Sequence, residues 1–157
     1  MHTVIPLLTS NGIRGTTKGF EVTPDWKPTS WWELKTSYSH LEMSMKNGPG
    51  SNDPALNRYE GSSPRHQVVI QSFVKLPKKL EFDQTYRYVS ALSAQMVQSY
   101  STADAHLSWQ TTPELEFSVV GENLLQPRHS EFGGDPGGLV GIKRSVYAKI
   151  TWRRAAN

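Results

Sequence analysis

The stretch "SVYAKITWRR", residues 145–154, decides the fold of this chain. Apolar and polar residues alternate along it, in the order Val146, Tyr147, Ala148, Lys149, Ile150, Thr151, Trp152. Because successive side chains of a β-strand point to opposite faces, the pattern predicts a strand with one apolar and one polar face. The apolar face would contact either a protein core or lipid. The polar face would contact either bulk water or a water-filled lumen.

The same alternation returns six times earlier in the chain. The predicted strands cover residues 18–26, 32–38, 68–76, 80–88, 103–109 and 115–119. Tight turns separate some of them, such as "KPTS" at 27–30, and long polar stretches separate others. No segment shows a competing period of 3.6 residues. We therefore predict an all-β fold, an antiparallel up-and-down meander of about seven strands.

Composition narrows the range of functions. The 157 residues amount to one domain and include no cysteine, which excludes disulfides and thiolate metal sites. The formal charge is +3, but Lys and Arg are spread along the chain, so we expect no binding to nucleic acid. The N-terminal "MHTVIPLLTS" has no basic start and its apolar run is broken by Pro6, so we expect no signal peptide.

Catalytic and metal chemistry is not indicated. The five histidines share no metal-ligand spacing, and we expect neither a metal nor a cofactor. Carboxylates such as Glu81 and Asp83 lie on the polar side of predicted strands together with Lys and Arg, as in a hydrated ionic wall. The Gly-rich 133–141 lacks the Lys-Ser/Thr of a phosphate-binding loop. We therefore expect that the chain is not an enzyme.

Three features favour lipid over a protein core on the apolar faces. The strands are long enough to cross a bilayer at a tilt, the tryptophans lie near strand ends, and short and long connections alternate. The alternative is a soluble β-rich ligand-binding module whose apolar faces meet in a sandwich. In either case one apolar surface should carry Val68, Ile70, Val74, Phe82, Leu107, Phe117, Ile150 and Trp152. The opposite surface should carry Glu33, Lys35, Gln71, Asp83, Arg87, His106, Glu116 and Lys149.

Four stretches in succession resemble one family. They are "GFEVTPDWKPTSWWELKTSYSHL" (19–41), "SSPRHQVVIQSFVKLPKKLEFDQTYRYV" (62–89), "YSTADAHLSWQTTPELEFSVVGENLLQPRHSEFG" (100–133) and "RSVYAKITWRR" (144–154). Their order resembles the C-terminal end of TonB-dependent outer-membrane receptors, over about residues 14–153. The resemblance implies a large barrel around a plug domain, and energised uptake of iron chelates, cobalamin or a similar nutrient.

On this resemblance, residues 1–157 are the C-terminal portion of such a receptor barrel. The portion forms part of a transmembrane β-barrel that is incomplete, without the plug domain, and is not transport-competent alone. It would lie in the outer membrane of a Gram-negative bacterium. Its expected partners are outer-membrane lipid, the remaining receptor strands and plug, the barrel-assembly machinery, and TonB only through the missing N-terminal part. The other possibility is a small barrel that closes independently.

Two groups of residues are candidate sites. The polar stretches 46–65 and 126–143 should share one end of the sheet, and ligand contacts there would come from Arg58, Tyr59, Arg128 and His129. In the family that the chain resembles, the assembly machinery recognises the last strand. The resemblance therefore implies an assembly signal at Tyr147, Ile150 and Trp152.

Overall fold

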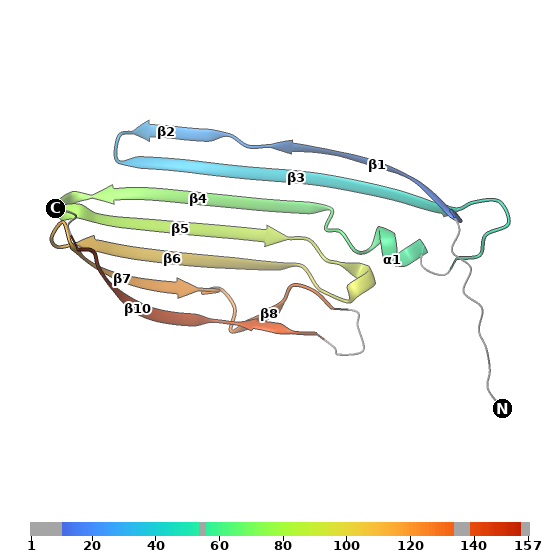
Figure 1. Ribbon diagram of the computed structural model, residues 1–157. Coiled ribbons are helices and arrows are strands. Elements are labelled where there is room, and N and C mark those ends of the chain that lie inside the picture. The colour runs from blue at the N-terminus through green and yellow to red at the C-terminus, as the bar shows by residue number, and fades with distance from the viewer. Residues whose placement is uncertain (1–10, 54–55, 134–138, 155–157) are drawn as a thin grey trace, which may run out of the picture.

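The computed structural model describes residues 11–53, 56–133 and 139–154 (Figure 1). The chain is all-β, and its main sheet is an antiparallel meander in the order β1-β3-β4-β5-β6-β7-β10, with β2 also paired to β3. The main strands are β1 (Ile13–Val22), β2 (Asp25–Thr29), β3 (Trp32–Asn47), β4 (His66–Leu76), β5 (Leu80–Val89), β6 (Tyr100–Gln110), β7 (Leu115–Glu122) and β10 (Ser145–Trp152). The sheet is open, since β1 and β10 do not pair, so it is not the small closed barrel that was the other possibility.

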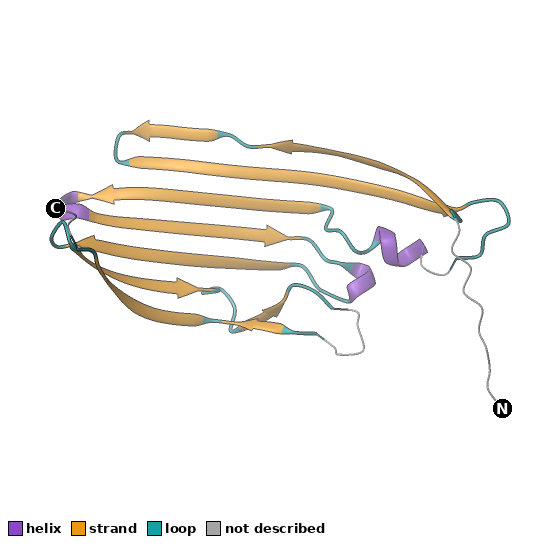
Figure 2. Ribbon diagram, viewed as in Figure 1, coloured by secondary structure: helices purple, strands orange, loops and turns teal. Residues whose placement is uncertain are grey.

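The short elements lie between these strands (Figure 2). They are α1 (Leu56–Glu60), the single 3-10 turns η1 (Pro77–Lys79) and η2 (Ser93–Gln95), and the hairpin of β8 (Arg128–Ser130) and β9 (Gly141–Lys143). As expected, the two long connections share one end of the sheet, opposite the tight turns (Figure 1). They are not plain loops, because the first contains α1 and the second contains the β8–β9 hairpin.

The sheet has eight strand segments in seven rows, because β1 and β2 form one interrupted row along β3. The interruption falls at Thr23 and Pro24, and proline has no N–H to donate to a ladder. The Pro24 carbonyl still accepts the N–H of Thr36 at 3.0 Å. The first predicted strand was therefore too short, since the row continues through β2 to Thr29. The turn expected at 27–30 lies instead at Ser30 and Trp31.

The predicted faces are confirmed by the strand register. Directly opposed residues of an antiparallel pair share a face. The chain of pairs Ile150–Phe117, Phe117–Trp109 and Val119–Leu107 links β10, β7 and β6. It continues through Leu107–Phe82 and Phe82–Val74 into β5 and β4. All eight residues expected on the apolar surface lie on this one face, the outer face. All eight polar residues lie on the opposite, inner face.

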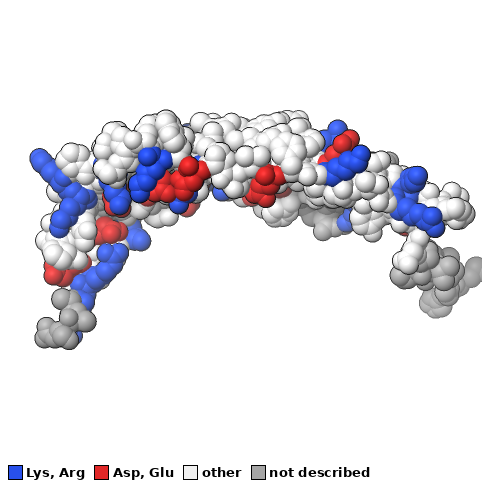
Figure 3. All heavy atoms as spheres, turned by 90° about the horizontal axis from the view of Figure 1, so that it is seen from above, with Lys and Arg blue, Asp and Glu red and all other residues white. Residues whose placement is uncertain are grey.

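The outer face is exposed and the inner face is crowded, the reverse of a soluble sheet packed on a core. Ile150 is 67% exposed, whereas Ser118, on the inner face of the neighbouring strand, is 5% exposed. Among the described residues only Val89, Leu92 and Val97 are buried hydrophobic side chains. The molecule is an arch, and its convex rim is nearly free of charged side chains in the view of Figure 3. Side chains converge on the inner face because that face is the concave side.

Candidate functional site at the loop end of the sheet

The connections at the loop end pack on one another through a glycine. Gly61, directly after α1, is buried, and its carbonyl accepts the N–H of Ala94 in η2 at 3.1 Å. A Cβ on Gly61 would lie 2.5 Å from the Ala94 nitrogen, closer than real Cβ atoms come. A glycine is therefore required where α1 and η2 meet, and this contact fixes one side of the site.

A pocket of about 320 Å³ lies between the start of β6 and β8. His129 is the buried polar side chain of its wall, and the imidazole stacks on the Tyr100 ring with 4.6 Å between centroids. Its Nε2 lies 3.1 Å from a Glu131 carboxylate oxygen, while its Nδ1 is buried with no hydrogen-bond partner. The aromatic ring and the carboxylate together fix the orientation of this imidazole.

Asn123 holds β8 and β9 in place from the end of β7. Its backbone N–H donates to Asp104 Oδ1 at 2.8 Å, and its side-chain Nδ2 donates to the Ile142 carbonyl at 3.1 Å. Ile142 in β9 is paired with His129 in β8. Asn123 has a φ of 54°, a left-handed conformation that asparagine tolerates better than most residues. One side chain therefore connects the main sheet to the pocket wall.

A second hollow of about 460 Å³ lies under α1, between the ends of β4 and β5. Arg65 and Glu60 supply its charged groups. The Ser90 hydroxyl accepts the backbone N–H of His66 at 3.0 Å. The Glu60 carboxylate also accepts the backbone N–H of Met45 in β3, which ties α1 to the sheet. Each hollow carries a cation and hydroxyl groups that suit a hydrogen-bonding ligand, and the second also has the Glu60 carboxylate.

The structure brings together two of the four predicted ligand contacts. Arg128 and His129 border the first pocket, but His129 is 8% exposed and held by Glu131. Arg58 and Tyr59 lie on the exposed side of α1 and line neither hollow. That these four residues contact a ligand stays a prediction.

Sequence reasoning missed Tyr100, Glu131 and Asn123. Tyr100 could have been included, because it opens a strand and its inner-face position follows from the period of two. Nothing in the polar stretch 126–143 signalled that it folds back as a hairpin and places His129 on Tyr100.

The residues of the expected assembly signal lie on both faces of β10. Ile150 and Trp152 are on the outer face, and Trp152 is 69% exposed. Tyr147 is on the inner face, where its hydroxyl donates to Glu122 at 3.5 Å. A surface that recognises Ile150 and Trp152 together would not contact Tyr147 from the same side.

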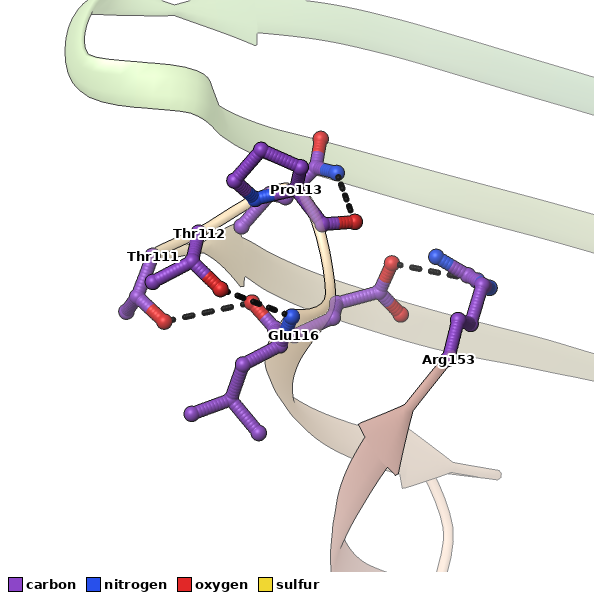
Figure 4. A network of polar contacts seen from close by, with 7 residues as sticks. Thr111, Thr112, Pro113, Glu116 and Arg153 are labelled. Atoms are coloured by element: carbon purple, nitrogen blue, oxygen red, sulfur yellow. Dashed lines mark hydrogen bonds and ion pairs between the residues drawn. The ribbon is translucent and has the colours of Figure 1, made fainter. Parts of the chain in front are cut away.

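A polar network fastens the end of β10 to the hairpin of β6 and β7 (Figure 4). Arg153 donates through its backbone N–H to the Glu114 carbonyl at 2.8 Å and through its guanidinium to Glu116 at 3.5 Å. In the turn, the Thr112 hydroxyl accepts the N–H of Leu115 at 3.1 Å. The C-terminal strand is thus held at the tight-turn end, away from both hollows.

Comparisons with known proteins add no relative. No family model, no curated protein and no solved structure matches this chain. Among the described residues, no helix is both long enough and apolar enough to cross a membrane.

Proposed function

We propose that this chain is the C-terminal portion of the β-barrel of a TonB-dependent outer-membrane receptor. The receptor takes up iron chelates, cobalamin or a similar nutrient, and the portion does not transport alone. In this proposal the outer face contacts lipid and the inner face lines the lumen. The two hollows at the loop end face the outside of the cell, where the receptor first meets its ligand.

A reversal of polarity along β3 carries this proposal. Between Trp32 and Tyr38 the outer positions are mainly apolar and the inner positions polar. Beyond His40 the outer positions are Glu42, Ser44 and Lys46, and the inner positions are Leu41, Met43 and Met45. The pairing of β3 with β4 ends at His40, and the pairing of β3 with β1 runs from Tyr38 to Asn47, through the reversal, without a shift.

A register slip is therefore not the cause of the reversal. What changes is the surrounding of the outer face, from apolar to aqueous, within one continuous strand. The apolar surface of a sandwich would stay on one face along the whole strand. A bilayer boundary at His40 accounts for the change.

The apolar part of the outer face, here called the apolar band, is about as tall as the apolar band of a transmembrane barrel. The ten residue steps from His66 to Leu76 in β4 cover about 33 Å of strand, which spans about 25 Å at a tilt of about 40°. Aromatic rings mark both borders. Trp26 packs edge-on against Trp32 at 5.8 Å near the tight turns. Phe20 and Tyr38 pack at 5.7 Å near His40.

The open edges favour a portion of a larger barrel. Within the described residues, β10 has no partner on its free side, and neither does the row of β1 and β2. In lipid, unpaired backbone N–H and C=O groups cost several kcal/mol each, so spanning strands occur in closed barrels. The remaining strands of a receptor would pair with these two edges.

Single-cysteine labelling tests the proposal, since the chain has no cysteine of its own. The full chain is reconstituted in phosphatidylcholine vesicles with a fluorophore at Ile70→Cys, Gln71→Cys or Ser44→Cys. We expect lipid-borne bromine to quench only the Ile70→Cys label, because Ile70 lies on the outer face within the band. Aqueous iodide should quench the other two labels, of which Gln71→Cys is the inner-face control and Ser44→Cys lies on the outer face above His40.

A soluble module would give no lipid quenching at any of the three positions, and this outcome would overturn the proposal. The larger receptor is tested separately by the nucleotide sequence before the Met1 codon. We expect it to encode further strands and a plug domain in frame. A promoter and a stop codon there would contradict the receptor assignment.

A further inference from the structure

We propose that His40 and His66 form a binding site for a divalent transition-metal ion, Cu²⁺ most tightly, on the outer face of the sheet where the pairing of β3 with β4 ends. The two histidines are directly opposed in the last pair of these strands. The spacing of histidines along the chain does not indicate this site, because the register of two strands brings the rings together. The site goes beyond the proposed function, since it needs no lipid on the outer face.

The backbone hydrogen bonds place these two side chains at the closest kind of cross-strand position. The next pair, Leu41 and Arg65, is hydrogen-bonded, because the Leu41 N–H donates to the Arg65 carbonyl at 2.9 Å. Hydrogen-bonded and non-hydrogen-bonded pairs alternate along an antiparallel ladder, so His40 and His66 are a non-hydrogen-bonded pair. The side chains of such pairs are closer together, with Cα atoms about 4.5 Å apart. Two imidazoles at this position can therefore reach one ion.

The distance between the two rings suits a shared metal. The ring centroids of His40 and His66 are 4.8 Å apart, with 39° between the ring planes. Two imidazoles that bond to one ion at about 2.0–2.1 Å, with an angle of about 90–110° at the metal, have centroids about 4.5–5.2 Å apart. The observed separation falls within this range. It matches adjacent positions of the tetragonal geometry that Cu²⁺ prefers, and Cu²⁺ binds nitrogen ligands most tightly among the divalent first-row metals.

The hydrogen bonding of both imidazoles also favours a metal. The Nδ1 atom of His66 lies 2.9 Å from the Tyr38 hydroxyl oxygen. When Nδ1–H donates to this oxygen, the Nε2 lone pair is free for a metal, and metal-binding histidines usually donate their other ring N–H in this way. The Nδ1 atom of His40 is buried and has no hydrogen-bond partner in the described part of the chain. A buried nitrogen without a partner is costly, and a metal ion is a partner that imidazole nitrogens accept.

The surroundings of the pair leave open positions on the ion. Among the described residues, no three His, Cys, Asp or Glu side chains are grouped to hold a metal, so the site has two protein ligands. His66 also lines the hollow of about 460 Å³ under α1, from which water can complete the coordination. On the other strand the Phe20 ring packs on His40 with 5.7 Å between centroids, which limits access of solvent from that side. The ion would therefore be exchangeable, unlike that of a closed four-ligand site.

A copper titration of the full chain in a neutral detergent tests this inference. The probe is Cu²⁺ bound to iminodiacetate, which leaves adjacent positions on the copper for two imidazoles. Pulsed electron paramagnetic resonance counts the imidazoles that bind. We expect two in the wild type, and one in His40→Gln with binding on the order of 100-fold weaker, because this variant loses a ligand. Tyr38→Phe should keep both imidazoles and bind about tenfold more weakly, because it removes only the hydrogen-bond partner of His66.

The matched control is His106→Gln, which removes a histidine that faces Asp83 across two strands of the inner face, at 3.7 Å. This control should keep two imidazoles and the wild-type affinity. One imidazole on the wild-type copper would overturn the inference, and so would two imidazoles in His40→Gln. Equal losses in His106→Gln and His40→Gln would place the copper elsewhere and would also overturn it. The wild-type count and the affinity of Tyr38→Phe decide the inference even if His40→Gln fails to fold.

Discussion

Ile70→Arg is expected to prevent insertion of the sheet into lipid vesicles. Ile70 lies on the outer face near the middle of β4, four residues from His66 and six from Leu76. An arginine on the lipid side of a barrel costs about 2–4 kcal/mol at the bilayer midplane, which is a loss of 30-fold or more in the inserted population. The measurement is the fraction of the full chain that floats with phosphatidylcholine vesicles and is protected from protease.

Two further arginine variants test whether the loss of insertion depends on the face of the sheet and on the depth in the bilayer. Gln71→Arg, one residue along β4, places the same charge on the inner face opposite Lys35 and Thr85, and insertion should be nearly unchanged. Ile150→Arg lies on the outer face, but only two residues from Trp152 at the end of β10, so its loss should be smaller than that of Ile70→Arg. Equal insertion of Ile70→Arg and Gln71→Arg would contradict the lipid-facing assignment of the outer face.

Asn123→Val is expected to detach the β8–β9 hairpin from the main sheet. The change places a β-branched residue at a φ of 54° and removes the hydrogen bond to the Ile142 carbonyl. Backbone strain and the lost bond together cost about 2–4 kcal/mol. The measurement is the rate of tryptic cleavage after Arg128 and Lys143, which should rise roughly tenfold or more as the hairpin opens.

The companion variant Asn123→Gly separates the two causes. Glycine adopts a positive φ without strain, so this variant loses only the side-chain hydrogen bond, a change of about 1 kcal/mol. Cleavage after Lys75, at the opposite end of the sheet, serves as the internal control and should not change in either variant. If Asn123→Val left the hairpin as resistant as the wild type, Asn123 would not be the anchor of the pocket wall.

The meander could be predicted because the sequence features that specify it are local. Each strand alternates with a period of two, and tight turns such as the one after Leu76 set the register of consecutive strands. The end of β3 was missed for a physical reason. Beyond Tyr38 the alternation continues, but Leu41, Met43 and Met45 move the apolar residues to the other face. A prediction that assumes the same environment along the whole strand places the end of the strand at this reversal.

The candidate site could be predicted only in part, because its contacts are distant in the sequence. Arg128 and His129 are polar residues of a long connection, as the sequence shows, and the structure places both at one pocket. The stacking of His129 on Tyr100 depends on the hairpin that Asn123 holds. Arg58 and Tyr59 lie apart from this pocket because the connection after β3 forms α1 rather than a loop reaching over the sheet.

The two free edges of the sheet differ in how readily they accept another strand. The row of β1 and β2 contains Pro24 and Pro28, and its register shifts between Trp26 and Thr29. Prolines and irregularities on an edge strand hinder pairing with other chains, whereas β10 is regular from Ser145 to Trp152. Two stray copies of the chain would therefore join through β10, and the pair would present only its proline-bearing edges. The prolines of that edge would then hinder further growth into long fibrils.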